Sequence, residues 1–142
     1  MSEFEFDADD FISKMTITEA KMVGAAADAL GDSADDLARI ASEIAPIKGS
    51  GLRKSVTKAI KLGSNGVTGE VSFSVTEKSG GKSFNYALWT HEQDYNLGEQ
   101  SGASPGTDGY QVGNKYLERP LKGESQRFID DWAKAIARGL LL

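Results

Sequence analysis

The turn Gly-Ser-Asn-Gly at residues 63–66 constrains the fold more than any other feature of the chain. It separates two segments, 52–62 and 67–76, in which apolar and polar side chains alternate. Alternation is the period of a strand that buries one face, and Asn-Gly is typical of tight hairpin turns. The sequence therefore predicts two antiparallel strands of a half-buried sheet. The apolar side chains expected on their buried faces are Leu52, Val56, Ile60, Leu62, Val67, Val71, Phe73 and Val75.

A third strand is expected shortly downstream. The segment KSGGKS at residues 78–83 has the composition of a second turn, and the segment FNYALWTHE that follows it is rich in aromatic side chains. Aromatic residues are enriched in strands. We therefore predict a three-stranded antiparallel sheet with the topology of a meander.

Residues 9–45 have the pattern of one long helix or of two nearly continuous helices. Alanine, the strongest helix former, is dense in this segment, whereas Gly31 predicts a break or bend. Pro46 is expected to end the helix, because the residue before a proline avoids the helical region. The acidic segment 1–8 is expected to be a flexible tail. The apolar residues near helical spacing are Phe11, Met15, Met22, Ala26, Ala29, Leu37, Ile40 and Ile44.

A second helix is predicted near the end of the sequence. Pro120 suits the first turn of a helix, and apolar residues follow it at spacings of four or seven. This stripe is Leu121, Phe128, Trp132, Ile136 and Leu140. The sequence thus predicts a single α+β domain, 1–142, with a long N-terminal helix, a three-stranded antiparallel meander, a long loop and a C-terminal helix packed on the sheet.

The long loop of this prediction is residues 93–114, which contain five glycines and no sustained period. A structureless stretch of this length is uncommon inside a compact domain and is usually functional or disordered. If the chain is a ring subunit, we expect the loop to reach into a neighbouring subunit or to line the lumen, and to become ordered on assembly. The alternative is an unstructured surface insertion.

Composition argues against several classes of protein. The chain has no cysteine, which removes disulfides, thiolate metal sites and cysteine nucleophiles. We expect no signal peptide, because the N-terminus is acidic and has neither a basic segment nor an apolar run. We also expect no membrane span, because no apolar run approaches the ~18 residues that a span needs. The formal net charge of −5 argues against a nucleic-acid binder held by phosphate contacts.

The charge is unevenly distributed along the chain. Residues 1–46 carry eleven acidic and three basic side chains, whereas residues 47–83 carry seven basic and two acidic ones. One interpretation is two solvated faces of opposite sign. The other is charge complementarity between copies of the protein or with neighbours in an assembly.

His91, the only histidine, is the one candidate for catalytic or metal chemistry, with Glu92 and Asp94 close behind it. On a strand, His91 and Glu92 would point to opposite faces and could not both bind one ion, and a zinc site usually takes three protein ligands. The serines lie in no nucleophile motif, and GSGLRKS lacks the spacing of a phosphate-binding loop. We therefore expect no metal, no cofactor and no enzymatic activity. A hydrolase that uses His91 with Glu92 or Asp94 is the alternative.

Three segments resemble, in their order and spacing, those of the small neck proteins of tailed bacteriophages, which are described as minor capsid, head–tail joining or tail-completion proteins. The segments are IAPIKGSGLRKSV at 44–56, YALWTHE at 86–92 and KYLERPLKGESQRF at 115–128. The resemblance spans about residues 38–138 and rests on order and spacing, because no single segment is specific.

The resemblance implies a structural virion protein that forms a ring, commonly a hexamer, at the head–tail interface. Its partners would be further copies of itself, the head-completion or connector proteins, and the tail tube or terminator proteins. DNA would pass through the lumen without specific binding, and no membrane would be involved. The protein would be found in the virion neck or tail, and in the host cytoplasm during assembly. The alternatives are a tail terminator ring and a small non-viral protein-binding module.

The resemblance carries over no catalytic residue, so its motif residues are interpreted as determinants of the fold and of subunit contacts. We expect Tyr86, Leu88 and Trp89 to pack the third strand, and His91 and Glu92 to mark where that strand releases the loop toward a neighbour. The motif residues are Gly51, Leu52, Tyr86, His91, Glu92, Leu117 and Pro120. The residues predicted at subunit contacts or in the loop are Arg53, Lys54, Trp89, His91, Glu92, Tyr95, Tyr110, Tyr116 and Leu117.

Overall fold

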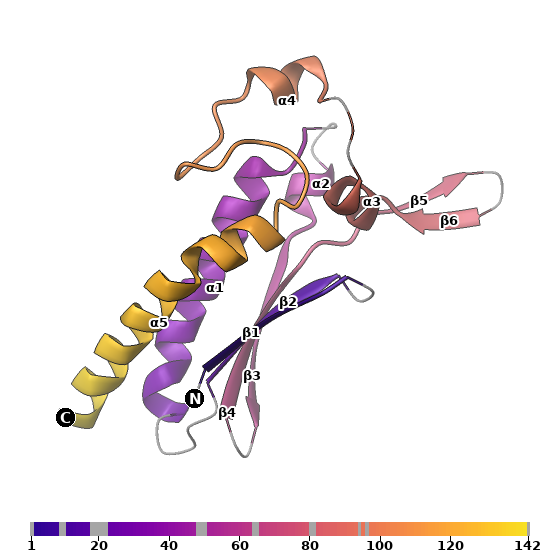
Figure 1. Ribbon diagram of the computed structural model, residues 1–142. Helices are drawn as coiled ribbons and strands as arrows, with labels where there is room; N and C mark the ends of the chain where they lie inside the picture. The colour runs from indigo at the N-terminus through magenta and orange to yellow at the C-terminus, as the bar shows by residue number, and fades with distance from the viewer. Residues whose placement is uncertain are drawn as a thin grey trace.

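The computed structural model shown in Figure 1 has the predicted α+β class, with a four-stranded antiparallel sheet in place of the predicted three strands. It describes residues 2–8, 11–17, 23–47, 51–63, 66–79, 82–93, 95 and 97–141. The elements are β1 (Ser2–Asp7), β2 (Ile12–Ile17), α1 (Val23–Ile44), α2 (Gly51–Lys54), β3 (Thr57–Gly63), β4 (Gly66–Ser72), β5 (Thr76–Ser79), β6 (Lys82–Asn85), α3 (Tyr86–Glu92), α4 (Glu99–Ala103) and α5 (Glu118–Leu141).

The N-terminal segment forms two strands of the sheet, so the predicted flexible tail and the predicted helical start at residue 9 are both wrong. The strand order is β1-β2-β4-β3, with every neighbouring pair antiparallel. Phe11 and Met15 are both buried, and their spacing of four residues fits one face of a strand as well as one face of a helix. The acidic segment joins the sheet because Phe4 and Phe6 alternate with acidic residues and pack against the core.

Helix α1 runs without a break through Gly31, so the predicted bend is wrong. Leu30, Ala34 and Leu37 on either side of the glycine are buried, and their packing holds the helix together across it. A Cβ at Gly31 would meet no atom, so the glycine serves no close contact. The predicted stop before Pro46 is correct, because α1 ends at Ile44.

The predicted hairpin around residues 63–66 is present as β3 and β4, but its first strand is exposed. Val67 and Val71 of β4 and Phe73 after it are buried as predicted. All of β3 is exposed, including Ile60 and Leu62, with 41% and 68% of their surfaces accessible. The prediction of a buried face for β3 is wrong because β3 is the edge of the sheet and lies at the rim of the helix layer. The N-terminal part of the predicted strand folds as α2, in which Leu52 is buried.

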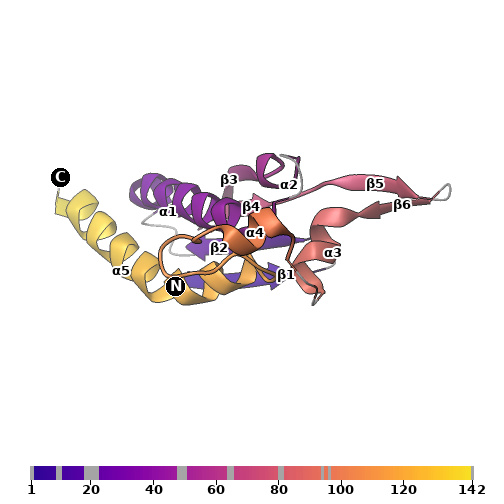
Figure 2. The same cartoon turned by 90° about the horizontal axis from the view of Figure 1, so that it is seen from above.

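The predicted third strand at 84–92 is also wrong beyond its first residues. Strand β6 ends at Asn85 and helix α3 begins at once. The Asn85 side chain accepts a hydrogen bond from the Leu88 amide at 3.2 Å, the geometry of a helix N-cap. Among the described strands, β5 and β6 pair only with each other, and Figures 1 and 2 show this hairpin extending away from the rest of the molecule.

Helices α1 and α5 pack together on one face of the four-stranded sheet (Figures 1 and 2). The predicted apolar stripe of α5 is correct for Leu121, Phe128 and Trp132, which are buried. Ile136 is partly buried against the core, and the Leu140 side chain lies outside the described residues. Burial of a side chain such as Phe128 contributes about 1.5–3 kcal/mol before entropy is counted. Among the described elements, the long helices that pack on the sheet both lie on this one face.

The segment predicted as a long loop, 93–114, contains the short helix α4 and packs on its own chain. The Gly113 amide donates to the Ile44 carbonyl at 3.0 Å, and the Ile47 amide donates to Ser101 Oγ at 2.7 Å. Gly106 has φ +75°, and a Cβ there would lie 2.1 Å from the Tyr110 carbonyl oxygen. The tight turn that follows therefore needs glycine at this position.

Candidate functional site

His91, the one candidate for catalytic or metal chemistry, is fully buried. Its ring stacks on Phe6 at 4.8 Å between centroids, and its edges meet Phe11 and Tyr116, each at 5.0 Å. None of its surface is accessible in the folded chain. A substrate cannot reach this imidazole without unfolding its surroundings.

The hydrogen bonds of His91 determine its tautomer. The Glu118 amide donates to Nε2 at 3.2 Å, so Nε2 carries no proton and Nδ1 donates to the Glu92 carboxylate at 2.6 Å. Lys115 Nζ approaches the same carboxylate oxygen at 2.8 Å. Burial lowers the pKa of His91 below its ordinary 6.5, and it outweighs the opposing effect of Glu92. The imidazole is therefore neutral at pH 7 and holds α3 to the start of α5.

His91 and Glu92 thus lie together at the end of a helix, and the expectation that they point to opposite faces of a strand is wrong. Both groups are nevertheless engaged within the chain. In the described part of the chain, no group of three or more histidine, aspartate and glutamate residues is placed to hold a metal ion.

Two of the three segments that carry the phage resemblance interlock around this histidine. The Lys115 amide donates to the His91 carbonyl at 2.8 Å, and Tyr116 Oη donates to the Ala87 carbonyl at 2.6 Å. Tyr116 and Leu117 are fully buried. Tyr116, Leu117 and His91, all predicted at subunit contacts, therefore occupy the interior of the monomer.

The third segment attaches α2 to the end of α1. Arg53 Nε donates to the Ala45 carbonyl at 2.8 Å, and Ser42 Oγ donates to the Arg53 carbonyl at 3.1 Å. Arg53 Nη2 is buried and has no hydrogen-bond partner among the described residues. Lys54, the other basic residue predicted here, is exposed.

An aromatic surface lies on α3 and just beyond it. The Trp89 ring stacks on Tyr86 at 6.4 Å and on Tyr95 at 5.4 Å, and 46% of Trp89 is accessible. Tyr95 Oη donates to the Thr90 carbonyl at 2.6 Å, which fixes the outer ring. Trp89 and Tyr95, both predicted at contacts, therefore form one stacked group at the surface.

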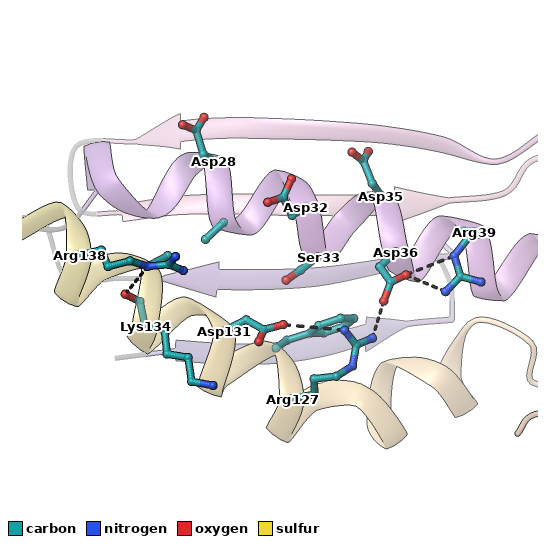
Figure 3. Close-up of a pocket in the computed structure, with 13 residues that line it drawn as sticks. Asp28, Asp32, Ser33, Asp35, Asp36, Arg39, Arg127, Asp131, Lys134 and Arg138 are labelled. Atoms are coloured by element: carbon teal, nitrogen blue, oxygen red, sulfur yellow. Dashed lines mark hydrogen bonds and ion pairs between the residues drawn. The ribbon is translucent and has the colours of Figure 1, made fainter. Parts of the chain in front are cut away.

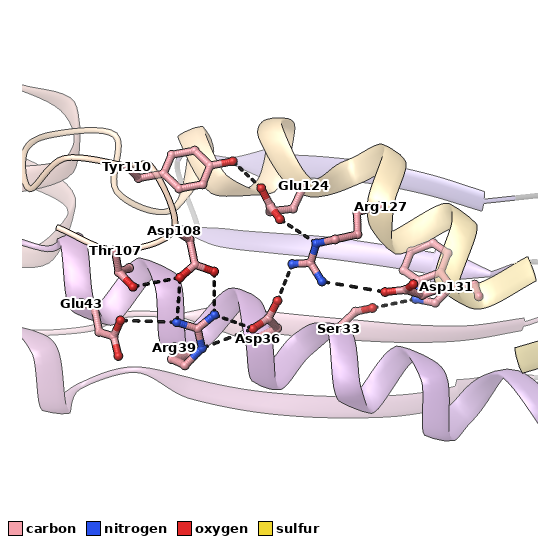
Figure 4. A network of polar contacts seen from close by, with 11 residues as sticks. Ser33, Asp36, Arg39, Glu43, Thr107, Asp108, Tyr110, Glu124, Arg127 and Asp131 are labelled. Carbon is pink, nitrogen blue, oxygen red and sulfur yellow. Dashed lines mark hydrogen bonds and ion pairs between the residues drawn. The ribbon is translucent and has the colours of Figure 1, made fainter. Parts of the chain in front are cut away.

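A chain of polar contacts joins the turn at 107–110 to both long helices (Figure 4). Arg39 Nη2 contacts Asp108 at 2.9 Å and Asp36 at 2.8 Å, and Arg127 also pairs with Asp36. Tyr110 Oη donates to Glu124 of α5 at 2.7 Å. Tyr110, predicted in a mobile or intersubunit loop, therefore makes its polar contact within the monomer.

Asp36 lies at the centre of this network. Burial acts to raise its pKa, but hydrogen bonds from Arg127 and Arg39 outweigh burial and hold the pKa below its ordinary 3.8. Asp36 is thus a carboxylate under ordinary conditions, and it joins the two arginines.

An open groove of about 860 Å³ runs between α1 and α5 (Figure 3). Asp28, Asp32 and Asp36 line its α1 wall, and Arg127 and Lys134 line its α5 wall. The volume is within the range of ligand sites, but such sites are mostly apolar and enclosed. Here the walls are charged, and Arg127 and Asp36 bond to each other, so the groove has the character of a helix–helix seam.

The two edges of the four-stranded sheet differ in charge. β1 carries Glu3, Glu5 and Asp7, and we call it the acidic edge; β3 carries Lys58 and Lys61, and we call it the basic edge. Lys58 contacts Asp35 of α1, and Lys61 contacts Glu70 of β4 at 2.9 Å. Exposed ion pairs of this kind contribute about 0–1 kcal/mol, so they hold the lysines only weakly.

Sequence reasoning missed the acidic edge and the aromatic residues around His91. Phe6 and Phe11, which contact the His91 ring, both come from the segment that was interpreted as a tail and a helix. The available signal was the alternation in EFEFD, residues 3–7, which has the same period as the segment after residue 66.

Comparison with known proteins shows no family model, no curated sequence and no solved structure that matches this chain. Among the helices as far as they are described, none is both long and apolar enough to cross a membrane.

Proposed function

We propose that the chain is a structural protein of a tailed bacteriophage that assembles into a ring at the head–tail interface. In this role it completes or joins the neck and makes or breaks no covalent bond. It acts through its contacts with further copies of itself and with the head-side and tail-side proteins next to it. A tail terminator ring is the nearest variant of this role.

The observation that carries the proposal is the placement of opposite charges on opposite edges of one sheet. A closed ring of identical subunits needs two different surfaces that fit each other head to tail. Glu3 and Glu5 lie at one edge, and Lys58 and Lys61 lie at the other. The two outer strands of the sheet therefore present edges of opposite charge, while α1 carries five further acidic side chains, one of which, Asp35, contacts Lys58.

Two further observations support a role in assembly. The hairpin of β5 and β6 extends from the body and pairs with no other described strand, so a neighbouring molecule can contact it from several sides. The stacked group of Tyr86, Trp89 and Tyr95 is partly exposed, and aromatic residues of this kind are enriched at protein interfaces.

The structure is compatible with the resemblance to the neck proteins of tailed bacteriophages. His91, the one residue that raised an enzymatic alternative, is buried and neutral, with both ring nitrogens bonded. No contact among the described residues favours a hydrolase over the structural role.

The experiment that tests the proposal is protein mass spectrometry of purified phage particles from a host that carries the gene. We expect the chain in intact particles at several copies per particle. The same measurement on separated heads and tails serves as the reference for the position of the chain in the particle. Its absence from intact particles, with abundant free chain in the lysate, would overturn the proposal.

A further inference from the structure

The acidic edge and the basic edge match in direction and length as well as in charge. The sheet has an even number of antiparallel strands, so β1 and β3 run in opposite directions. A second copy placed beside the first in the same orientation therefore brings its β1 antiparallel to β3. An edge strand presents unpaired backbone N–H and C=O groups that can accept such a neighbour.

The register within the sheet places the two edge strands at the same height. Ser2 of β1 pairs with Ile17, which pairs with Val67, which pairs with Leu62 of β3. At the other end, Asp7 is connected in the same way to Thr57. Copies related by rotation about a ring axis can therefore align the whole of β1 with β3.

The side chains along this junction are complementary on both faces. On the helix side, one row across the sheet runs Phe4, Met15, Gly69, Ile60, so Phe4 of the next copy would lie beside Ile60. Ile60 is 41% accessible in the monomer, and an added strand would cover it.

On the open side, the neighbouring row runs Glu3, Thr16, Thr68, Lys61. Glu3 of the next copy would therefore lie opposite Lys61. Opposite charges facing each other across strands stabilise the pairing, and like charges destabilise it. Homotypic pairing of two acidic edges is disfavoured for the same reason.

We propose that copies of this chain join by pairing β1 of one copy with β3 of the next, so that a single antiparallel sheet continues around the ring. This inference rests on the proposed ring and specifies its interface: Glu3 meets Lys61, and Phe4 meets Ile60. The occupant of each edge is another copy of the same chain.

The absence of cysteine from the chain makes disulfide trapping a direct test. In the variant Glu3→Cys with Lys61→Cys, the two positions within one copy are separated by three strand spacings, about 14 Å. Disulfides need Cα atoms about 4.4–6.8 Å apart, so only a junction between copies can close the bond. The matched control is Asp7→Cys with Lys61→Cys, which lies on the same face but is offset by four residues, about 13 Å along the strand.

The test oxidises both variants as concentrated purified chain and within phage particles, followed by non-reducing electrophoresis. We expect a ladder of chain multimers for the Glu3 and Lys61 pair, at least tenfold stronger than for the control. A control ladder of equal strength, or bonds to a different protein, would overturn the inference. A particle or an oligomer that contains the chain but gives no ladder would also overturn the inference. The proposed function would still stand in that case. A chain that is monomeric when purified and absent from particles contradicts both.

Discussion

His91 shows how the surroundings of a residue decide its role. Its position next to Glu92 and near Asp94 suggested acid–base chemistry, but the Glu118 amide and the Glu92 carboxylate occupy both ring nitrogens. Three aromatic rings surround the imidazole. Burial and complete hydrogen bonding make it a residue that connects α3, α5 and the N-terminal strands.

The buried imidazole predicts that acid destabilises the fold. In the unfolded chain His91 takes up a proton near its ordinary pKa of 6.5, whereas in the folded chain burial lowers that pKa despite Glu92. The contribution of His91 to stability is therefore complete above pH 6.5. As the pH falls from 6.5 to the lowered pKa of the folded chain, the free energy of unfolding decreases by at most about 1.4 kcal/mol per pH unit. Urea unfolding between pH 8 and pH 5 measures this loss.

The variant His91→Gln provides the comparison for this measurement. Its stability at pH 8 is expected to be lower, but the decline that begins near pH 6.5 should be absent. Burial acts to raise the pKa of Glu92, but the hydrogen bond from Lys115 opposes this effect, and the pKa lies below its ordinary 4.5. Glu92 therefore adds a further loss of stability only as the pH falls below 4.5. If the free energies of unfolding of the two proteins changed in parallel between pH 6.5 and pH 5, this result would contradict the role assigned to His91.

At the scale of elements, one buried hydrogen bond joins the two long helices. Trp132 Nε1 donates to Ser33 Oγ at 2.8 Å, and both residues are buried. We expect Ser33→Ala to lower the free energy of unfolding by about 1–3 kcal/mol, because it leaves the indole N–H without a partner. Chemical denaturation of Ser33→Ala, Trp132→Phe and the double variant measures the coupling.

The double variant should lose about 0.5–3 kcal/mol less than the sum of the single variants, because the two residues share one contact. Ser125→Ala is the matched control, since Ser125 donates to Lys122 within α5 at an exposed position. We expect its effect to stay within about 0.5 kcal/mol. If the stability losses of the two single variants add up to that of the double variant, the hydrogen bond does not couple the helices.

The elements that could be predicted from the sequence are those whose period admits one interpretation. The segment 67–73 alternates over enough residues to identify a strand, and Leu121 and Phe128 lie seven residues apart, an odd spacing that keeps one face of a helix but not one face of a strand. Phe11 and Met15 could not be assigned, because a spacing of four residues fits both periods. The aromatic segment at 84–92 was misassigned because the Asn85 cap outweighs strand propensity there.

The candidate site was less predictable than the elements, because exposure depends on the position of a strand within the sheet. Ile60 and Leu62 have the pattern of buried residues, yet β3 is an edge strand. Tyr116 and Leu117 were predicted at subunit contacts or in the loop, and Leu117 also as a determinant of the fold; both are buried within the monomer. The uneven charge along the chain could be read from the sequence, but its division between two edges required the strand order.

At the scale of the whole molecule, the two edges predict a charge-dependent assembly. Glu3→Lys or Lys61→Glu alone places like charges together at every junction and should weaken association about two- to fivefold per junction. The double variant Glu3→Lys with Lys61→Glu exchanges the two charges and should restore association. Light scattering over a range of protein concentrations measures both effects.

Salt provides the control for this experiment. The Debye length falls from about 10 Å at 0.1 M to about 3 Å at 1 M ionic strength, so the difference between wild type and the single variants should shrink in concentrated salt. Equal weakening by the single and the double variants would show that the two charges do not meet.

The most direct test of the central claim is an electron cryo-microscopy map of the neck of particles that contain this chain. We predict a closed ring of copies of this monomer at the head–tail interface, with the acidic edge of each copy facing the basic edge of the next. A map in which the chain is absent from the neck, or is present there as isolated copies with both edges free, would contradict it.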